Sequence, residues 1–433
     1  MHQRNSWLQM LCLALGLTLW AASASAQPFA QLLEETVTAH DLVVAAEARR
    51  DGAKAQVSFA RGAWLPHLDA VANIGPEWID YPGDADTTEE VRDMQRLAVK
   101  QLLFDFGQGG AGIARAKAGL ARAEAELSAV RQEIMLQGIS AYLDVLRNME
   151  RVRLARESEQ RIMELTGIEE TLVTKGAGLA SDVLQAKSQL AGARAQLVRV
   201  QGQLALSKNR FMAVFGVNPS EDFLANLIPP SVPFDRTPAS REEAEAAAFE
   251  NSIEIMVAQF NVEMARQDVS GAKAGYFPKF HLVGEAEREN NDQGISGERK
   301  ELRGMVELTW DIFSGGRQQA LTREARSALT DHQSRLEDLQ NRVREKVSGA
   351  WQDLLTTREN AALLRDQAVI LEEFLELAKR ERLLGTRSLL DVLNGEVGHL
   401  NALSEAVSAE TDRAISLYNL FYAMGRLDFD LVR

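Results

Sequence analysis

The chain has 433 residues, of which 25% are charged and 6% aromatic, and its formal net charge at pH 7 is −14. This excess of acidic residues argues against a nucleic-acid partner, because nucleic-acid-binding proteins present a basic surface. The single cysteine, Cys12, lies in the leader segment described next, so we expect neither a disulfide nor a thiol nucleophile in the processed chain.

Residues 1–26 are expected to form a cleaved signal peptide. Arg4 precedes an apolar stretch from Leu8 to Trp20, and residues 24–26 are small, as a signal peptidase requires. Removal of this segment takes away Arg4 and changes the formal charge from −14 to −15. No long apolar run follows it, so the sequence excludes a helical membrane protein, whose spans need ~20 apolar residues.

Proline is absent from two long segments, between Pro82 and Pro219 and from Lys279 to the C-terminus. Since a proline inside a helix costs ~3 kcal/mol, very long helices are permitted there. Both segments carry apolar residues at intervals of seven: Leu120, Leu127 and Ile134, and later Leu329, Leu336 and Val343. We therefore predict long helices over residues 108–173 and 316–383.

The sequence contains an internal repeat. Residues 101–107 align with residues 310–316 at an offset of 209, whereas residues 64–66 match residues 276–278 at an offset of 212. The first offset holds without a gap at later pairs: Tyr142 with Trp351, Gly176 with Gly385, Asp182 with Asp391, and Gly216 with Gly425. The chain therefore divides into a first repeat at 27–216, a proline-rich connector at 217–239, a second repeat at 240–425 and a tail at 426–433.

Each repeat is predicted to contain the same elements in the same order. One opening helix ends at Pro66 or Pro278, where the hydrophobic pattern changes from helical spacing to alternation. The predicted strands are residues 65–78, 95–106, 277–289 and 301–313, and the helices that follow the long helices are residues 182–215 and 390–424.

The predicted strands are apolar on one side and polar on the other, as in a membrane barrel with a wet lumen. Four strands are too few to close a barrel, which needs about eight. Because open strand edges are not tolerated in a bilayer, the chain must oligomerise, or its strands lie outside a membrane.

No motif indicates an enzyme. Residues 107–112 spell G-x-G-x-x-G, but a very long helix follows them, whereas a dinucleotide fold needs a short helix and then a buried strand. The histidines lack metal-ligand spacing, and no catalytic constellation stands out. We predict no catalytic residue, cofactor or metal.

Two glycines mark tight turns between helices. Gly176 and Gly385 are predicted to end the long helices in left-handed caps. Ser181 in the first repeat and Ser388 in the second are each expected to cap the helix that follows. Asp182 and Asp391 would then lie in the first turn of these helices. This capping role by itself requires no further function.

The duplicated order of helix, strand hairpin, long helix, tight turn and helix resembles the TolC-like outer-membrane factor family, also called outer membrane efflux proteins. Residues 103–107 and 312–317 resemble its strand-to-helix junction, and residues 385–393 resemble its tip turn. The resemblance implies a mixed α and β fold and a homotrimer. In that trimer a twelve-stranded outer-membrane β-barrel continues into a periplasmic α-helical barrel, with the connector in an equatorial belt.

The resemblance also implies a function. The trimer would be a passive exit duct, surrounded by outer-membrane lipid, that meets a periplasmic adaptor protein and an inner-membrane pump of the ABC or RND type. Its cargo would be either a secreted protein or drugs. The alternative is a periplasmic coiled-coil scaffold without a pore, which leaves the alternating strands unexplained.

The family resemblance assigns roles to the tip residues. Asp391 matches a carboxylate that lines a narrow, cation-attracting periplasmic entrance in the family, and Asp182 is its first-repeat counterpart. Asn394 stands where the family often has a second acid, which predicts weaker cation attraction. We expect Arg382 and Arg387 to bridge to Asp182 on an adjacent hairpin. The adaptor is expected to contact the tip turns at Gly176, Ala177, Gly178, Gly385, Thr386, Ser388 and Leu389.

Overall fold

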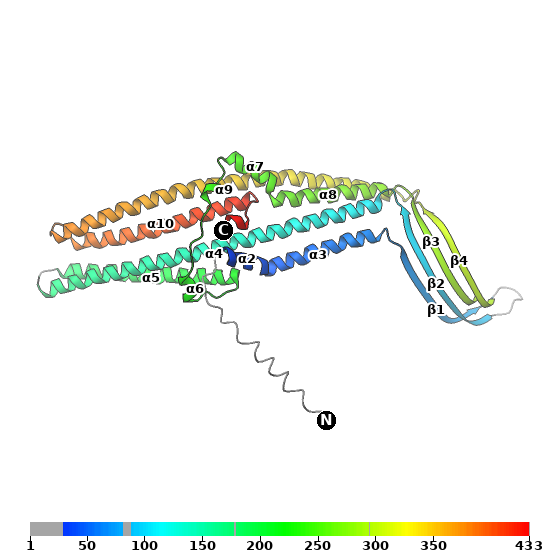
Figure 1. Ribbon diagram of the computed structural model, residues 1–433, viewed down its shortest axis with the longest axis horizontal. Helices are drawn as coiled ribbons and strands as arrows, with labels where there is room; N and C mark the ends of the chain where they lie inside the picture. The colour runs from blue at the N-terminus through cyan, green and yellow to red at the C-terminus, as the bar shows by residue number, and fades with distance from the viewer. Residues whose placement is uncertain (1–28, 81–87, 177–178, 294, 433) are drawn as a thin grey trace, which may run out of the picture. The chain divides into compact units, whose positions relative to one another are not determined.

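The computed structural model describes residues 29–80, 88–176, 179–293 and 295–432 (Figure 1). The predicted signal peptide and the turn residues Ala177 and Gly178 lie outside these ranges. The chain forms two compact units. The sheet unit comprises Val44–Ala129 and Ile253–Arg342, and the hairpin unit comprises Val130–Ser252, Val343–Arg433 and the segment before Val44.

The sheet unit contains one antiparallel sheet of four strands in the order β1-β2-β3-β4 (Figure 1). The strands are β1 (His67–Ile79), β2 (Thr88–Phe104), β3 (Lys279–Asp292) and β4 (Ile295–Thr309). Strands β2 and β4 begin earlier than the predicted residues 95 and 301. The apolar alternation ends there because both faces become polar, but the pairing of the strands continues.

The two faces of the sheet differ in chemistry. Cross-strand partners lie on the same face, and successive residues alternate between faces. One face, which we call the charged face, carries ion pairs such as Lys100 Nζ with Glu307 Oε1 at 2.7 Å. The opposite apolar face bears exposed side chains that include Leu68, Leu97, Val99, Leu282, Leu302, Val306 and Leu308.

The opening helix of each repeat is broken, so the prediction of one continuous helix was wrong. The first repeat has α2 (Phe29–Ala39) and α3 (Asp41–Gly62), and the second has α7 (Arg241–Asn251) and α8 (Ile253–Ala274). The breaks fall at His40 and Ser252, which are 212 positions apart, the upstream repeat offset. Ser252 is extended, with φ −61° and ψ 117°. The Leu42 N–H bonds to His40 Nδ1 at 3.2 Å, which replaces a helical bond.

The glycine-rich motif after β2 has a structural role. The buried Asp105 carboxylate accepts hydrogen bonds from the N–H groups of Gly107 at 3.1 Å and Gly109 at 2.6 Å. Gly107 has a φ of +96°, and a Cβ on Gly109 would lie 2.8 Å from Trp64 Nε1. These glycines are therefore explained by a tight turn and a close contact at the start of α4.

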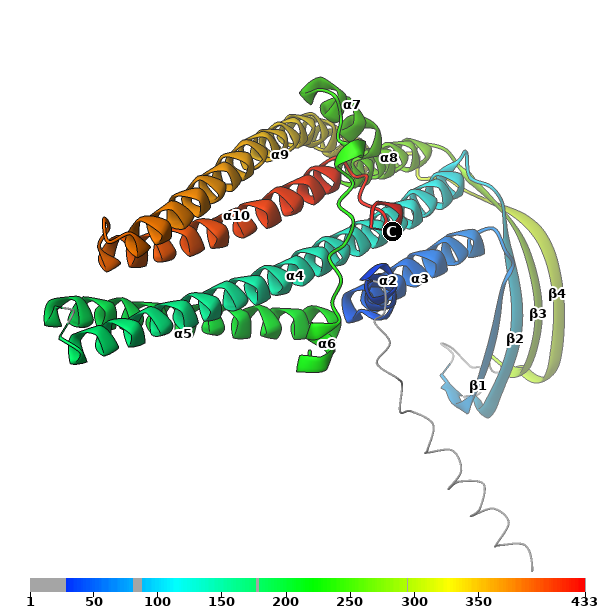
Figure 2. The ribbon, with the colours of Figure 1, turned by 60° about the vertical axis from the view of Figure 1, so that its left-hand side comes forward.

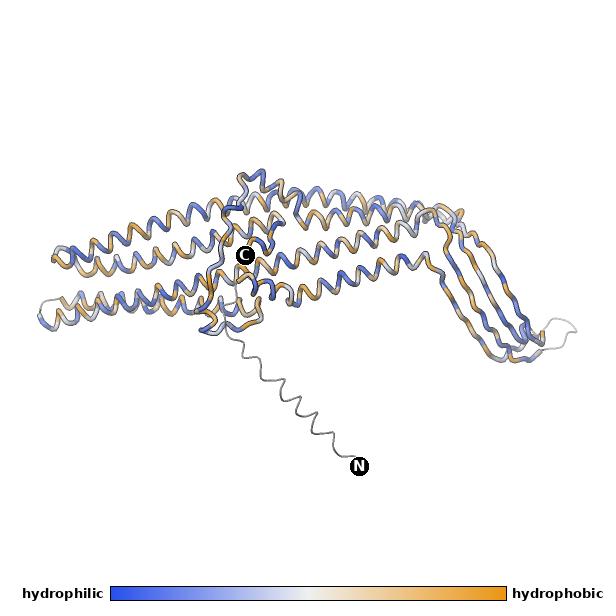
Figure 3. The backbone as a smooth tube through the Cα atoms, in the orientation of Figure 1, coloured by the Kyte–Doolittle hydropathy of each residue, from blue (hydrophilic) through white to orange (hydrophobic). Residues whose placement is uncertain are grey.

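Long helices dominate the rest of the chain. α4 (Gln108–Thr174) and α9 (Arg317–Leu383) each have 67 residues, and at 1.5 Å per residue each is about 100 Å long. Figure 3 shows hydrophilic and hydrophobic residues interspersed along both. Across the described ranges, no helix is both long enough and apolar enough to cross a membrane.

The hairpin unit contains two helical hairpins, their connecting segments and α2. α5 (Ala180–Phe215) runs beside the second part of α4, and α10 (Leu389–Ala423) beside the second part of α9 (Figures 1 and 2). The connector forms α6 (Glu221–Ala225) and the 3₁₀ turn η1 (Phe234–Arg236), and the tail forms η2 (Phe429–Leu431). Tyr142, Phe211 and Tyr418 are among its largest fully buried side chains.

Candidate functional site

The turn between α9 and α10 closes with a glycine cap and a serine cap. Gly385 has a φ of +78°, and the Thr386 N–H donates to Glu381 O at 3.0 Å, which ends α9. Ser388 Oγ accepts from the Asp391 N–H at 3.2 Å and donates to Asp391 Oδ2 at 2.8 Å. Ser388 is therefore the N-cap of α10, as the sequence predicted for this turn.

The turn between α4 and α5 closes differently. Gly176 has a φ of +76°, as expected for a left-handed cap. The N-cap of α5 is Leu179, which has no capping side chain, so a capping role for Ser181 was wrong. Ser181 lies inside the helix, where its hydroxyl donates to Asp182 Oδ1 at 3.3 Å. Leu179 corresponds to Ser388 at the offset of 209, so the two α-helices begin at equivalent positions but do not share a capping side chain.

The two tip arginines contact residues other than Asp182 in the described part of the chain. Arg382 on α9 forms a short ion pair with Glu169 on α4, whose side chain is 2% exposed. Arg387 Nε lies 2.9 Å from Glu381 Oε2, and its guanidinium lies 5.1 Å from the centre of the Phe374 ring. The expected bridge to Asp182 is therefore not made within one chain.

A fully buried carboxylate close to the turns was not predicted from the sequence. Glu396 on α10 accepts a hydrogen bond from Arg161 Nη1 on α4 at 2.7 Å, and Lys379 Nζ on α9 lies 3.4 Å away. The signal for Glu396 is an acid on an apolar helical stripe, four residues after Val392 and four before Leu400. Such a position is unfavourable for a carboxylate unless a partner helix supplies a cation.

Among the polar contacts that join the α4/α5 hairpin to the α9/α10 hairpin, three lie towards the turns, and we call them the tip links. They are Arg161 with Glu396, Glu169 with Arg382, and Gln189 Nε2 donating to Asn394 Oδ1 at 3.2 Å. Apolar packing accompanies them in a cluster of Ile162, Ala186, Leu389 and Leu393. The hairpins are thus held together near the turns by buried charge and by apolar contact.

The turns also expose groups that nothing in the described chain covers. Asp391 and Asn394 are exposed, and Asp182 is half-buried. Leu383, Leu384 and Leu179 are exposed by 88%, 79% and 65%, which is unusual for leucine. Exposed apolar side chains at two adjacent turns suit a protein partner.

Comparison with known proteins shows the family to which this chain belongs. The family model described as outer membrane efflux protein matches residues 32–217 and 246–426. The outer membrane efflux protein BepC of Brucella suis is 24% identical over 375 residues, which are 86% of this chain and 80% of that protein. The alkaline protease secretion protein AprF of Pseudomonas aeruginosa is 24% identical over 388 residues, 86% of this chain and 79% of that protein.

A solved structure shows the same fold. The Campylobacter jejuni CmeC outer membrane channel matches with a TM-score of 0.79 and 16% identity, over 93% of this chain and 87% of that chain. The predicted TolC-like fold, with two repeats of helix, strand hairpin, long helix and helix, is confirmed.

Proposed function

The chain belongs to the outer membrane efflux protein family, and from this premise we propose that it is the passive exit duct of a tripartite export system. The family consists of outer-membrane channel proteins rather than enzymes, and this chain is an outer membrane protein. The duct would carry substrate from an inner-membrane pump across the periplasm and the outer membrane.

The observation that carries the proposal is the sheet, which has one charged face, one apolar face and two outer strands. Among the residues that the structure describes, β1 and β4 each pair along one side only. A bilayer does not tolerate such edges, and about eight strands are needed for closure. We infer a homotrimer, in which β4 of each copy pairs with β1 of the next and twelve strands close around a charged lumen.

The hairpin turns would form the periplasmic entrance. In a trimer, Asp182 and Asp391 would border the opening, with Asn394 one turn further along α10. The tip links would hold the hairpins in place, and a bridge from Arg382 or Arg387 to Asp182 of a neighbouring copy stays a prediction. The exposed leucines and the turn residues Gly176, Gly385, Thr386 and Ser388 would face the adaptor protein. Leu389 was also expected there, but its side chain is buried in the apolar cluster between the hairpins.

The relatives do not favour one cargo over another. BepC is named for efflux and AprF for secretion of a protease, and both are 24% identical to this chain. The pump is therefore proposed as an ABC or RND-type transporter without a choice between them. Co-purification of the native complex, after cross-linking in cells, identifies which pump and adaptor accompany the chain.

The decisive experiment is extraction of the protein from the outer membrane, followed by conductance measurements in planar lipid bilayers. A trimer that conducts ions supports the duct. A soluble periplasmic monomer without conductance overturns it and supports the scaffold without a pore.

A further inference from the structure

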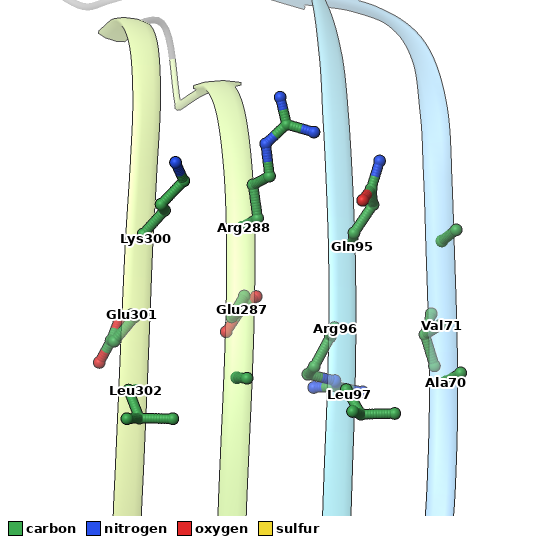
Figure 4. Close-up of a pocket in the computed structure, with 12 residues that line it drawn as sticks. Ala70, Val71, Gln95, Arg96, Leu97, Glu287, Arg288, Lys300, Glu301 and Leu302 are labelled. Carbon is green, nitrogen blue, oxygen red and sulfur yellow. The ribbon is translucent and has the colours of Figure 1, made fainter.

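Two rows of side chains cross the apolar face of the sheet with different chemistry. The pairing of the strands places Ala70, Leu97, Ala286 and Leu302 in the first row. The second row, nearer the ends of β1 and β3, consists of Ala72, Gln95, Arg288 and Lys300. We call them the alanine–leucine row and the arginine–lysine row. Figure 4 shows Leu97 and Leu302 on the first and Gln95, Arg288 and Lys300 on the second.

The two rows border a shallow hollow of about 670 Å³. Its lining includes the small side chains of alanines, and the larger side chains of Leu97 and Leu302 lie next to them. Leu302 is 85% exposed. A trough with an alanine floor and leucine walls fits an extended hydrocarbon chain. The arginine–lysine row lies at one end of this trough.

Arg288 and Lys300 are direct cross-strand partners, an arrangement that is destabilising for like charges unless an anion lies between them. Glu298 supplies that anion. One of its carboxylate oxygens forms a short bond with Arg288 Nε, and the other lies 3.2 Å from Lys300 Nζ. The row is thus built to hold two oxygens of one anionic group between two cations.

The position of the row along β4 matches the edge of a lipid layer. Ten residues separate Lys300 from the exposed Trp310. At about 3.3 Å per residue and a tilt of about 40°, they span roughly 25 Å, which is the height of the apolar band of an outer-membrane barrel. With Trp310 at one interface, Arg288 and Lys300 lie at the level of the headgroups of the opposite leaflet.

We propose that Arg288 and Lys300 bind the phosphate of an anionic lipid, whose acyl chain lies in the trough over Ala286. Glu298 occupies the place of the phosphate when no lipid is bound. This inference rests on the proposed function, since it requires that the apolar face of the sheet contacts lipid.

The test uses the full processed chain in lipid nanodiscs, with a fluorophore on Gly304→Cys. Gly304 lies beside the site on the apolar face, and a Cβ there meets no atom within 4 Å. Met305→Cys, on the charged face, is the matched control. Quenching by brominated phosphatidylglycerol is compared with quenching by brominated phosphatidylcholine at equal mole fraction. We expect up to about fivefold enrichment of phosphatidylglycerol per cation.

Three variants test which charged residues cause the preference for phosphatidylglycerol. Arg288→Gln with Lys300→Gln should abolish the preference for phosphatidylglycerol. Arg96→Gln with Arg303→Gln, which removes the same charge from the opposite face, should retain it. Glu298→Gln should increase it, because the carboxylate no longer competes with the phosphate. This increase tests the site even if the double variant at Arg288 and Lys300 fails to fold.

The outcomes separate the inference from the proposed function. If brominated phosphatidylcholine quenches the probe at residue 304 and not at 305, the apolar face contacts lipid. Equal quenching by the two lipids would then overturn the phosphate site alone. If neither lipid quenches the probe at residue 304, the membrane position of the sheet is wrong, and the inference is overturned with it.

Discussion

The Arg161 guanidinium on α4 bonds at 2.7 Å to the carboxylate of Glu396 on α10, a side chain that is 1% exposed. Lys379 on α9 approaches the other carboxylate oxygen at 3.4 Å, so one buried acid connects three helices. Arg161 and Lys379 are 43% and 38% exposed, so they stay hydrated if the acid is removed, and the stability at stake is that of the charge-assisted contacts to Glu396.

Glu396→Ala is therefore expected to destabilise the hairpin unit by about 2 kcal/mol, the contribution of a hydrogen bond to a charged group, and to lower its melting temperature. The matched control is Glu150→Ala. Glu150 pairs at 2.5 Å with Arg153 on the exposed side of α4, and this hydrogen bond lowers the Glu150 pKa. An exposed pair of this kind contributes less than about 1 kcal/mol. Equal melting shifts in the two variants would contradict the buried role of Glu396.

The pair of Glu169 and Arg382 is expected to hold the entrance narrow. Glu169→Gln and Arg382→Gln should each raise single-channel conductance, and the double variant should raise it no further, because both remove one link. Arg194→Gln is the control, since Arg194 pairs at 3.0 Å with Glu159 inside the same hairpin. Additive increases in the double variant would show that the two residues act separately.

Asp391→Asn should weaken the preference of the channel for cations. A unit charge about 8 Å from a permeating ion in water changes the ion's energy by about 0.5 kcal/mol, or about twofold in permeability. Asp182→Asn should act in the same direction, because the offset of 209 places it at the same point of the first-repeat turn. Reversal potentials under a salt gradient measure the effect. An unchanged potential in both variants would remove these residues from the entrance.

Tyr418→Phe is expected to leave stability at neutral pH unchanged or slightly improved. The Tyr418 hydroxyl is buried and has no hydrogen-bond partner among the described residues. Burial raises the pKa of Tyr418 to about 12 from an ordinary value of 10.0. Above pH 10 the unfolded chain therefore loses this proton and the folded chain keeps it, so the wild type loses stability between pH 10 and 12. The variant should lose about 2 kcal/mol less over that window.

Tyr142→Phe is the matched comparison for Tyr418→Phe, because the buried Tyr142 hydroxyl does have hydrogen-bond partners. The Tyr142 hydroxyl donates to Ile228 O at 2.8 Å and accepts from Ile228 N at 3.2 Å, which ties the connector to α4. Removal of this hydroxyl should lower the free energy of unfolding by about 1 kcal/mol at neutral pH. Chemical denaturation of the two variants side by side measures the difference, and a larger loss for Tyr418→Phe would contradict the assignment.

Gly216 and Gly425 occupy equivalent places in the two repeats but should respond differently to alanine. Both have a positive φ, 68° and 71°, so alanine adds backbone strain of about 1 kcal/mol at each. A Cβ on Gly216 would meet no atom within 4 Å, whereas one on Gly425 would lie 2.3 Å from Asn251 O. Gly425→Ala should therefore be destabilising by several kcal/mol, at least about 3 more than Gly216→Ala. Similar melting temperatures would disprove the close contact.

The long helices and their ends could be predicted because their determinants are local. The absence of proline permits them, and glycines at 176 and 385 end them, so the observed ends at Thr174 and Leu383 lie within one residue of the prediction. The breaks at His40 and Ser252 were missed. Neither is a glycine or a proline, and the residues on both sides favour a helix.

The sequence by itself determined the duplicated order of elements, the two faces of the strands and the positions of Asp182 and Asp391, because period and repeat offset are properties of the chain. Only the tertiary structure decided that Arg382 pairs with Glu169, that Arg161 and Lys379 meet Glu396, and that a Cβ would clash with Asn251 at Gly425 but meet nothing at Gly216. These contacts join residues remote in sequence. They depend on the axial register between packed helices, and one turn of sliding along a helix would exchange each partner for another.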